Sequence, residues 1–374
     1  MTRKALLSVN SAWNIVNFRS GLIRALQADG WDVVTAAPPD EHVDRLLALG
    51  CRFIALPMDN GGTDPIRDVS LYWRFRRILR DERPDVFLGF TIKPNVYGSL
   101  AANSLGIPTI NNIAGLGTAF IRKSWVTLVA RWLYRLALRK SHRILFQNED
   151  DRRYFIESGI LDAARTDRVP GSGVDLTAFA QSALPPLGSG GTLRFLFIGR
   201  VLRDKGVLEY VEAARRTRAA GVAAEFFILG PVDAQNRTAL SRIEVDQWVS
   251  DGSIHYLGVA DDVRPHIEAA HCVVLPSYRE GVPRTLLEAA SMGRPLIATR
   301  APGCRDVVDD GVNGFLVDVG DGADLADKCM RFAALADDDR ARMGSASRAK
   351  VEREFDERLV VQKYLECLRP LGTP

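Results

Sequence analysis

The chain has 374 residues, of which 47% are hydrophobic and 25% are charged, and its formal net charge is +3 at pH 7. This composition is typical of a soluble globular protein, and the length favours two domains of roughly 100–200 residues each. No run approaches the roughly 18 uncharged apolar residues that a membrane-spanning helix needs, and the N-terminal stretch lacks the apolar segment of a signal peptide. We therefore expect a cytoplasmic protein whose five cysteines, which form no C-x-x-C pair, are reduced and mostly buried.

Short apolar runs alternate with helical patterns in the first half. Strands are expected at 4–10, 31–37, 51–58, 84–90, 108–115 and 143–149, and helices at about 18–29, 41–50 and 67–82. Alternation of this kind predicts a parallel sheet covered by helices. Between Asp85 and Glu149 the chain carries eight basic residues and no acidic one, which indicates that this half faces an anionic partner or surface.

The alternation restarts after a stretch rich in Pro, Gly and Ser. Strands are expected at 193–199, 224–230, 254–258, 272–277, 295–299 and 314–317, with one helix ending near 220. We predict an α/β chain of two Rossmann-like, doubly wound domains that face each other across a ligand cleft at the carboxyl ends of their strands. The expected parts are an N-terminal domain at 1–180, a linker at 181–192, a C-terminal domain at 193–355 and a helix at 356–374 that packs back towards the first domain.

The first candidate motif follows the strand expected at 193–199. Gly199 ends this strand, Arg200 and Lys205 lie in the next turn, and Gly206 opens a helix. Basic side chains beside the free N–H groups of a helix N-terminus suit a diphosphate. The alternative is an ordinary strand–helix turn whose basic side chains are only solvated.

The second motif holds two glutamates eight positions apart. Glu280 lies in a turn after a strand, and Glu288 lies on a short helix that opens near Pro283. A carboxylate just before a helix lies near its positive pole, where two acids could hold one ligand. The alternative is that Glu280 caps the helix while Glu288 pairs with Arg284 at i,i+4 spacing.

The third motif is a turn after the strand that ends near Thr299. Gly303 lies in this turn and leads into a helix that runs to about Asp309. Backbone N–H groups in such a turn can bind an anion or a sugar hydroxyl. The alternative is a plain strand–helix loop.

In this combination and order, the motifs resemble those of the retaining glycosyltransferase family four, or glycosyltransferase group 1, which has the two-domain GT-B fold. The matching stretches are 171–179, 199–206, 275–299 and 303–317. The Glu-x7-Glu segment in its strand–turn–helix context is the most specific of them. Residues 91–102 and 112–120 are similar to a narrower branch that adds sugars to undecaprenyl-diphosphate-linked saccharides, including the N-acetylgalactosaminyltransferases that act on lipid-linked bacillosamine.

The resemblance implies a donor site in the second domain. Arg200 and Lys205 would hold the donor's diphosphate. Glu280 would accept hydrogen bonds from the hydroxyls of the transferred sugar, and Glu288 from those of the ribose. The catalytic residues implied are thus Arg200, Lys205 and Glu280. Other donor-binding positions implied are Gly199, Gly281, Val282, Pro283, Gly303, Cys304 and Arg305, with residues near Leu229–Val232 and Leu257–Val259 beside the base.

The family retains the anomeric configuration of the donor, and the implied route is front-face departure of the nucleoside diphosphate, whose phosphate oxygen takes the acceptor's proton. Cations and helix amides would stabilise the leaving group. No metal or other cofactor is expected, because the Asp-x-Asp candidate at 337–339 lies in a late helical segment and the five histidines show no ligand spacing. Ala114 departs from the pattern of many relatives, which have a histidine there, so no imidazole is expected from this position.

The acceptor side is expected in the first domain, where the loop at 10–19 would face the cleft. Its candidates are Asn14, Lys93, Asn95 and Gly115, with Lys93 as a ligand of the acceptor's diphosphate. Residues 121–140 predict one amphipathic helix. Its apolar face would hold Trp125, Val129, Trp132, Leu133 and Leu136, and its basic edge Arg131, Arg135 and Arg139. Such a helix suits an anionic bilayer; the alternative is a core helix with an exposed basic edge.

We therefore expect a retaining hexosyltransferase, peripheral at the inner face of the cell membrane and without a nucleic-acid partner. It would move a hexose or N-acetylhexosamine from a nucleotide sugar, with a UDP-sugar favoured, to a lipid-diphosphate-linked saccharide in surface polysaccharide, O-antigen, capsule or glycan biosynthesis. The alternatives are a sugar-nucleotide 2-epimerase of the same fold and a non-catalytic nucleotide-sugar-binding protein. A nicotinamide dehydrogenase is disfavoured, because Phe120 stands where the third Gly of a Gly-x-Gly-x-x-Gly motif is required.

Overall fold

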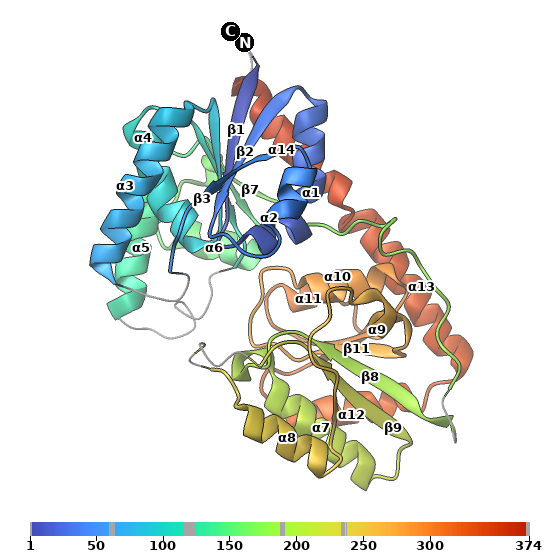
Figure 1. Ribbon diagram of the computed structural model, residues 1–374. Coiled ribbons are helices and arrows are strands. Elements are labelled where there is room, and N and C mark those ends of the chain that lie inside the picture. The colour runs from blue at the N-terminus through green and yellow to red at the C-terminus, as the bar shows by residue number, and fades with distance from the viewer. Residues whose placement is uncertain are drawn as a thin grey trace. The chain divides into compact units, whose positions relative to one another are not determined.

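The protein is described by a computed structural model that covers residues 2–59, 64–115, 125–187, 191–232, 236 and 238–371, without the side chains of 125–127. The chain divides into two compact units (Figure 1): Met1–Ser172 together with Glu357–Pro374, and Gly173–Asp356. None of the described helices is long and apolar enough to cross a membrane.

The first unit is built on a seven-stranded sheet in the order β3-β2-β1-β4-β5-β6-β7. All of its neighbouring strands are parallel, and the order reverses between β1 and β4, as in a doubly wound fold. Its strands are β1 (Arg3–Ser8), β2 (Trp31–Ala37), β3 (Arg52–Ala55), β4 (Val86–Phe90), β5 (Thr109–Ile113), β6 (Arg143–Phe146) and β7 (Thr166–Arg168).

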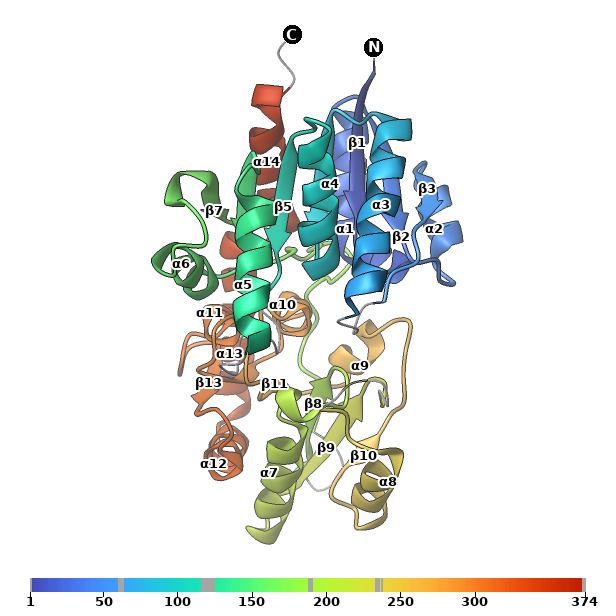
Figure 2. The same ribbon diagram turned by 90° about the vertical axis from the view of Figure 1, so that its left-hand side faces the viewer.

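Helices cover both faces of this sheet. In chain order they are α1 (Ala12–Ala28), α2 (Val43–Ala48), α3 (Pro65–Glu82), a π-helical turn (Pro94–Gly98), α4 (Ser99–Ser104), α5 (Trp125–Leu138), α6 (Glu149–Glu157) and α14 (Glu357–Leu368). Helices α3, α4 and α5 lie side by side on one face, and α1 packs with α14 on the other (Figure 2). Each helix turns an apolar stripe to the sheet, and in α3 this stripe is Leu71, Phe75 and Leu79.

Helix α1 begins six residues before the start expected at 18, and the stretch 10–19, predicted to be a loop, supplies its first turns. The reason is a cap, because the Ser11 hydroxyl accepts a hydrogen bond from the Asn14 N–H, 3.1 Å away. The sequence pattern placed the helix by its apolar residues and overlooked this serine.

The second unit has a six-stranded parallel sheet in the order β10-β9-β8-β11-β12-β13. Its strands are β8 (Leu193–Ile198), β9 (Ala224–Leu229), β10 (His255–Tyr256), β11 (Cys272–Leu275), β12 (Leu296–Thr299) and β13 (Gly314–Val317). Its helices are α7 (Val207–Ala219), α8 (Arg242–Ser250), α9 (Arg264–Glu268), α10 (Arg284–Ser291), α11 (Cys304–Val307), α12 (Gly322–Ala333) and α13 (Asp337–Glu354). The two parallel sheets confirm the predicted α/β fold class.

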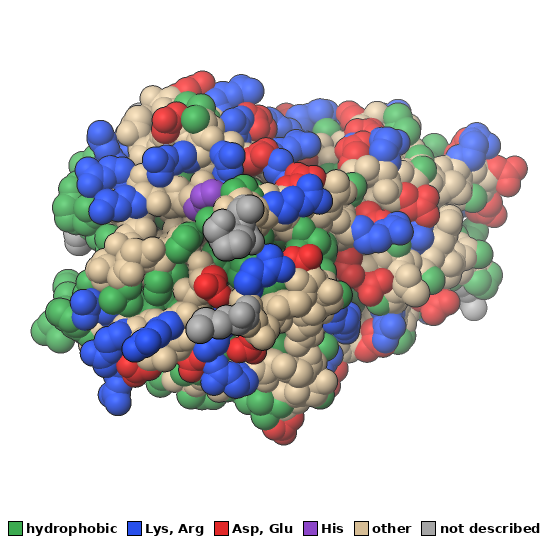
Figure 3. Space-filling view, turned by 90° about the horizontal axis from the view of Figure 1, so that it is seen from above, with side chains coloured by type: hydrophobic (Ala, Val, Ile, Leu, Met, Phe, Trp, Pro, Cys, Tyr) green, Lys and Arg blue, Asp and Glu red, His purple; other side chains and the backbone are tan. Residues whose placement is uncertain are grey.

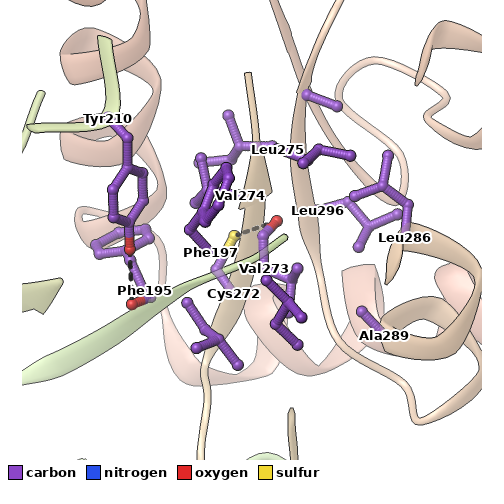
Figure 4. Packing of buried hydrophobic residues seen from close by; sticks show 14 of the residues in the cluster. Phe195, Phe197, Tyr210, Cys272, Val273, Val274, Leu275, Leu286, Ala289 and Leu296 are labelled. Atoms are coloured by element: carbon purple, nitrogen blue, oxygen red, sulfur yellow. Dashed lines mark hydrogen bonds between the residues drawn. The ribbon is translucent and has the colours of Figure 1, made fainter. Parts of the chain in front are cut away.

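Aromatic and aliphatic side chains from β8, β11 and the helices beside them form the core of the second unit (Figure 4). Tyr210 of α7 is fully buried, and its hydroxyl donates to the carbonyl oxygen of Phe195, 2.9 Å away. Burial without this bond would be costly for a phenol. The bond therefore ties α7 to β8, whose carboxyl end leads into the first candidate motif.

All five cysteines of the chain are free and buried, as expected, and burial raises the pKa of their thiols.

The boundary between the units falls at Gly173 and not in the linker expected at 181–192. Arg294, itself buried in the second unit, donates to the carbonyl oxygens of Ser182 and Ala183 at 2.9 Å each. A stretch without secondary structure can be held in place when its carbonyl groups find buried donors. Composition alone therefore placed the boundary too late.

The C-terminal segment returns to the first unit at Glu357. Tyr364 of α14 is buried there, and its hydroxyl oxygen accepts a hydrogen bond from Asn112 of β5, 3.0 Å away. Residues 188–190 of the expected linker and 372–374 of the expected C-terminal helix lie outside the described residues.

Candidate functional site

The turn after β8 packs directly on the turn after β11. Gly206 has a φ of +74°, and a Cβ atom at this position would lie 2.0 Å from the carbonyl oxygen of Pro276. A glycine is required, because any other residue would be strained and would collide with this carbonyl. The close approach brings the first and second motifs together at the carboxyl edge of the sheet.

Lys205 and Glu280 meet at this junction as an ion pair between Nζ and Oε1. Their side chains are 24% and 14% exposed, so water reaches both. The Ser277 hydroxyl donates to the same Oε1 atom at 2.7 Å and helps to hold the carboxylate in place. Two residues that are 75 positions apart in the sequence thus form one charged unit.

The third motif packs on the same turn. Gly303 has a φ of +81°, and a Cβ atom there would lie 2.1 Å from the carbonyl oxygen of Gly281. The Glu280 N–H donates to the carbonyl oxygen of Pro302 at 3.2 Å. Three loops, which follow β8, β11 and β12, therefore converge on Glu280.

The simple explanation offered for Glu288, an i,i+4 pair with Arg284, holds in the structure. Helix α10 begins after its N-cap residue Pro283, whose side chain makes no capping hydrogen bond. Glu288 does pair with Arg284, whose Nε lies 2.8 Å from Oε1 of the carboxylate. Burial raises the pKa of Glu288, although Arg284 opposes this shift.

The remaining donor-side candidates differ in their exposure. Gly281, Pro283 and Gly303 are buried in the packed loops, Val282 is half-buried, and Arg200 and Arg305 are exposed. Cys304 is fully buried, so its thiol belongs to the core and only its backbone can serve a ligand.

The region expected beside the base lies next to the first motif. The Gly199 N–H donates to Leu229 O at 2.9 Å, and the Gly230 N–H donates to Gly258 O at 2.7 Å. Leu257 and Val259 are exposed, whereas Leu229 is buried. Residues 233–235, next to Val232, lie outside the described residues.

Sequence reasoning missed Tyr278, which lies inside the second motif. Its hydroxyl donates to Glu209 of α7 at 2.6 Å, and its N–H donates to the carbonyl oxygen of Asp204 at 3.0 Å. These bonds fasten the turn that carries Lys205 to the turn that carries Glu280. A tyrosine two residues before a glutamate gives no signal of such a contact, because Glu209 is 69 positions away.

In the first unit, Lys93 follows β4 and pairs with Asp68 of α3, 2.6 Å away. The Tyr97 hydroxyl donates to the second oxygen of Asp68 at 2.8 Å. Lys93 and Asp68 line a surface hollow at the carboxyl edge of the sheet, together with Pro57, Met58, Asp59, Arg67, Leu71 and Arg74. Lys93 thus lies in a hollow with two further cations, but its charge is already balanced by Asp68.

The side chains of two other acceptor-side candidates, Asn95 and Asn14, make hydrogen bonds to neighbouring residues of the first unit. Asn95 is only 1% exposed; its amide donates to the carbonyl oxygen of Asn112 at 2.8 Å and accepts from Asn111 at 2.9 Å. These bonds hold the π-helical turn on β5, so the contacts of Asn95 in this structure are internal. Asn14 lies in the first turn of α1, where its amide donates to Asn10 at 3.3 Å.

The stretch around Gly115 is only partly described. Gly115 itself is half-buried and Ala114 is exposed, whereas 116–120 lie outside the described residues, Phe120 included. The same holds for 121–124 and for the side chain of Trp125 in the expected amphipathic helix.

The described part of the chain holds no group of three or more His, Cys, Asp or Glu residues arranged to bind a metal ion. Residues 337–339 form the first turn of α13, where acids are favoured by the helix dipole.

Two family models match the chain. The model "Glycosyl transferase 4-like domain" matches residues 16–171, and "Glycosyl transferases group 1" matches residues 192–334, which includes all three motifs of the second unit. The chain belongs to the group 1 glycosyltransferases. The enzyme has the two Rossmann-like units of the GT-B fold.

Curated relatives agree with this assignment. The glycosyltransferase is 25% identical over 368 residues, 94% of this chain and 95% of the relative, to the N,N'-diacetylbacillosaminyl-diphospho-undecaprenol alpha-1,3-N-acetylgalactosaminyltransferase of Campylobacter jejuni. It is 26% identical, over 72% of this chain and 70% of the relative, to the UDP-Gal:alpha-D-GlcNAc-diphosphoundecaprenol alpha-1,3-galactosyltransferase of Escherichia coli. Among solved structures, HepE of Anabaena in complex with UDP-glucose superposes with a TM-score of 0.79 at 18% identity, covering 98% of this chain and 99% of that one.

Proposed function

We propose that this glycosyltransferase moves a hexose or N-acetylhexosamine from a UDP-sugar to a saccharide on a lipid diphosphate, with retention of the anomeric configuration, in the biosynthesis of a surface polysaccharide or glycan. The observation that carries the proposal is the Lys205–Glu280 unit, on which three loops converge at the carboxyl edge of the second sheet. The two curated relatives support the acceptor class, because both are named for diphosphoundecaprenol-linked substrates. The names of the E. coli relative and of the HepE complex support UDP as the carrier.

In this proposal the cations act on the leaving group. Lys205 and the exposed Arg200 hold the donor's diphosphate, and the backbone N–H groups around Gly303, Cys304 and Arg305 complete its site. Negative charge grows on the diphosphate as the glycosidic bond breaks, and cations fixed in advance stabilise it. The proton of the acceptor hydroxyl passes to an oxygen of the departing diphosphate on the same face.

The two glutamates hold the two sugars of the donor. Glu280 accepts hydrogen bonds from the transferred sugar, and the ion pair with Lys205 places its carboxylate next to the diphosphate. Glu288 accepts from the ribose hydroxyls, and Arg284 beside it opposes the rise in its pKa that burial causes. On the acceptor side, Lys93 binds the lipid diphosphate after Asp68 releases it.

The proposal is tested with a panel of UDP- and GDP-sugars and a short-chain lipid-diphosphate saccharide. We expect release of UDP only when both substrates are present, and NMR of the product should show the donor's anomeric configuration. Isomerisation of the free UDP-sugar without acceptor would identify a 2-epimerase instead. Binding of the UDP-sugar without turnover on any acceptor would identify a non-catalytic protein.

A pH series tests the role of Glu288. As pH falls through its raised pKa, the carboxylate gains a proton and loses acceptor capacity, so the donor KM should rise at low pH. Arg284→Gln removes the charge that lowers this pKa and should move the rise in KM to higher pH. Glu288→Gln should raise the donor KM about tenfold with little change in kcat and no pH step. An unshifted profile in Arg284→Gln would contradict the pairing as a determinant of donor binding.

Chelation tests the proposed independence from metals. Because cations of the protein itself face the diphosphate, dialysis against EDTA should leave the rate unchanged. The control is the same preparation with Mg²⁺ or Mn²⁺ restored. Loss of the rate with EDTA and its return with one of these ions would contradict this part of the proposal.

We further propose that the enzyme is peripheral at the inner face of the cell membrane and contacts anionic lipids through α5. Supporting this are the exposed Val129, Trp132 and Leu136 and the neighbouring Arg135 and Arg139. Two residues that were expected on this exposed surface contact the protein itself instead. Leu133 packs against the core, and Arg131 turns back to the carbonyl oxygen of Ser158, 3.2 Å away.

A further inference from the structure

Helix α3 carries an apolar stripe on its outer side. Ile66 is 82% exposed, Trp73 is 58% exposed, and Val69 between them is also exposed. These residues follow i, i+3 and i+7 spacing and so share one side of the helix, roughly opposite the buried Leu71 and Phe75. This stripe therefore faces away from the sheet, where nothing in the described first unit covers it.

Helix α5 repeats the arrangement. Val129, Trp132 and Leu136 have the same i, i+3 and i+7 spacing, and Trp132 is 62% exposed. Tyr134 and Leu138 lie on the opposite side and are buried. Among the described side chains, α3 thus presents Ile66, Val69 and Trp73 to solvent, and α5 presents Trp132 with the aliphatic Leu128, Val129 and Leu136.

Both stripes lie over the same face of the first sheet. Helix α4 packs between α3 and α5, and Figure 2 shows the three helices side by side. Figure 3 shows hydrophobic side chains projecting at the left-hand edge, on the side where Figure 1 places α3 and α5, with Lys and Arg side chains beside them. The two stripes therefore belong to one surface of the unit.

The two helices also point the same way. Each connects two parallel strands, β3 to β4 and β5 to β6, so each runs opposite to the strands and begins at their carboxyl edge. On α3 the apolar stripe lies in the first half of the helix, whereas on α5 it extends to Leu136, close to the end of the helix. Basic residues lie near the end of both helices. On α3 these are Arg76, Arg77 and Arg80, of which Arg77 and Arg80 share Asp81 as an ion-pair partner, and at α5 they are Arg135, Arg139 and Lys140.

We infer that α3 and α5 together form a two-helix surface that docks on an anionic bilayer, with Trp73 and Trp132 in the interface and the basic ends at the lipid phosphates. The inference rests on the proposed contact of α5 with the membrane and adds α3 as an equal partner. Tryptophan with aliphatic neighbours suits the boundary between headgroups and acyl chains, and clustered arginine and lysine suit anionic headgroups.

The charges favour a bilayer over a second copy of the chain. Within the described residues, Arg135, Arg139 and Lys140 make no ion pair. The acids of α3 are already balanced, since Asp68 pairs with Lys93, Asp81 with Arg77 and Arg80, and Glu82 with Lys4 and Arg52. A symmetric contact between two copies would bring like charges together. The apolar stripe of α3 lies near the start of the helix, at the sheet edge where Lys93 follows β4 and pairs with Asp68, so docking of α3 would bring this edge, with the candidate acceptor residue Lys93, to the membrane.

Sedimentation with vesicles of phosphatidylcholine and phosphatidylglycerol tests the inference without any substrate. Trp73→Ala and Trp132→Ala should each weaken binding about tenfold. Arg135→Ala and Arg139→Ala should weaken binding about fivefold each, and only with anionic vesicles. The matched control compares Ile66→Ser with Ile243→Ser on α8, because Ile243 is 80% exposed and also lies in the first turn of its helix. We expect Ile66→Ser to weaken vesicle binding and Ile243→Ser to leave vesicle binding unchanged.

The outcomes separate this inference from the proposed function. If Trp132→Ala weakens binding and Trp73→Ala does not, α5 docks alone and the two-helix surface is wrong. If neither variant changes vesicle binding, the membrane contact itself is wrong. If the variants instead change the mass in light scattering, the surface binds another copy and the inference fails. All replaced side chains are exposed, so unchanged thermal unfolding should accompany each result.

Discussion

Replacement of Glu280 by Ala is expected to lower kcat by about 10²–10³, with a smaller change in the donor KM. Glu280 is the point on which the three loops of the second unit converge, and it carries the ion pair with Lys205. The alanine removes the carboxylate that we propose accepts from the transferred sugar's hydroxyls, and it also removes the ion-pair partner of Lys205. Both losses affect the transition state, in which the sugar separates from the diphosphate.

The measurement is the rate of UDP release with saturating donor and acceptor. Glu280→Gln keeps the shape of the side chain and removes its charge, so it separates the two losses. Glu212→Ala is the matched control, because it removes a surface glutamate of the same unit that pairs with Arg216. Normal transfer by Glu280→Ala would overturn the site.

Lys205→Ala is expected to cost about 10²–10³ in kcat, because one preorganised cation at the leaving diphosphate is lost. Lys205 lies next to Glu280, and the close contact of Gly206 with Pro276 prevents the turn from withdrawing. Lys205→Arg should restore part of the rate, since the charge returns but the guanidinium does not fit the place of a compact ammonium.

Arg203→Ala is the control in the same turn. Arg203 is also basic, but it is exposed and pairs with Glu244 on α8 instead of pointing to Glu280. If the two variants lost equal amounts of activity, the effect would belong to the stability of the turn and not to the charge of Lys205. A comparison of thermal unfolding would then show equal losses of stability as well.

The meeting of the three motifs of the second unit could be predicted because their residues follow strands of one parallel sheet. The carboxyl ends of such strands share an edge, so motifs after β8, β11 and β12 must lie near one another. Their order along the chain was therefore enough to expect that Lys205, Glu280 and Gly303 would meet. The pairing of Arg284 with Glu288 was also open to prediction, since i,i+4 residues on a helix are neighbours.

Contacts between distant residues were not open to prediction. Asn95 was a candidate for ligand binding, but it is buried against Asn111 and Asn112, because β4 and β5 are neighbours and the π-helical turn folds over them. Tyr278 gave no signal, since its partner Glu209 comes from another helix. The unit boundary was misplaced for the same reason, because Arg294 holds residues that are more than 100 positions away.

The sequence by itself determined the alternation of strands and helices, the two Rossmann-like units and the family, because these depend on local periodicity and on short motifs. Only the tertiary structure decided which polar side chains form hydrogen bonds within the protein and which apolar helix stripes are exposed to solvent. The sequence shows the helical spacing of Ile66, Val69 and Trp73. This spacing is the same whether the stripe is buried in the core or exposed to solvent. Only the packing of Leu71, Phe75 and Leu79 on the sheet turned this stripe outward, beside that of α5.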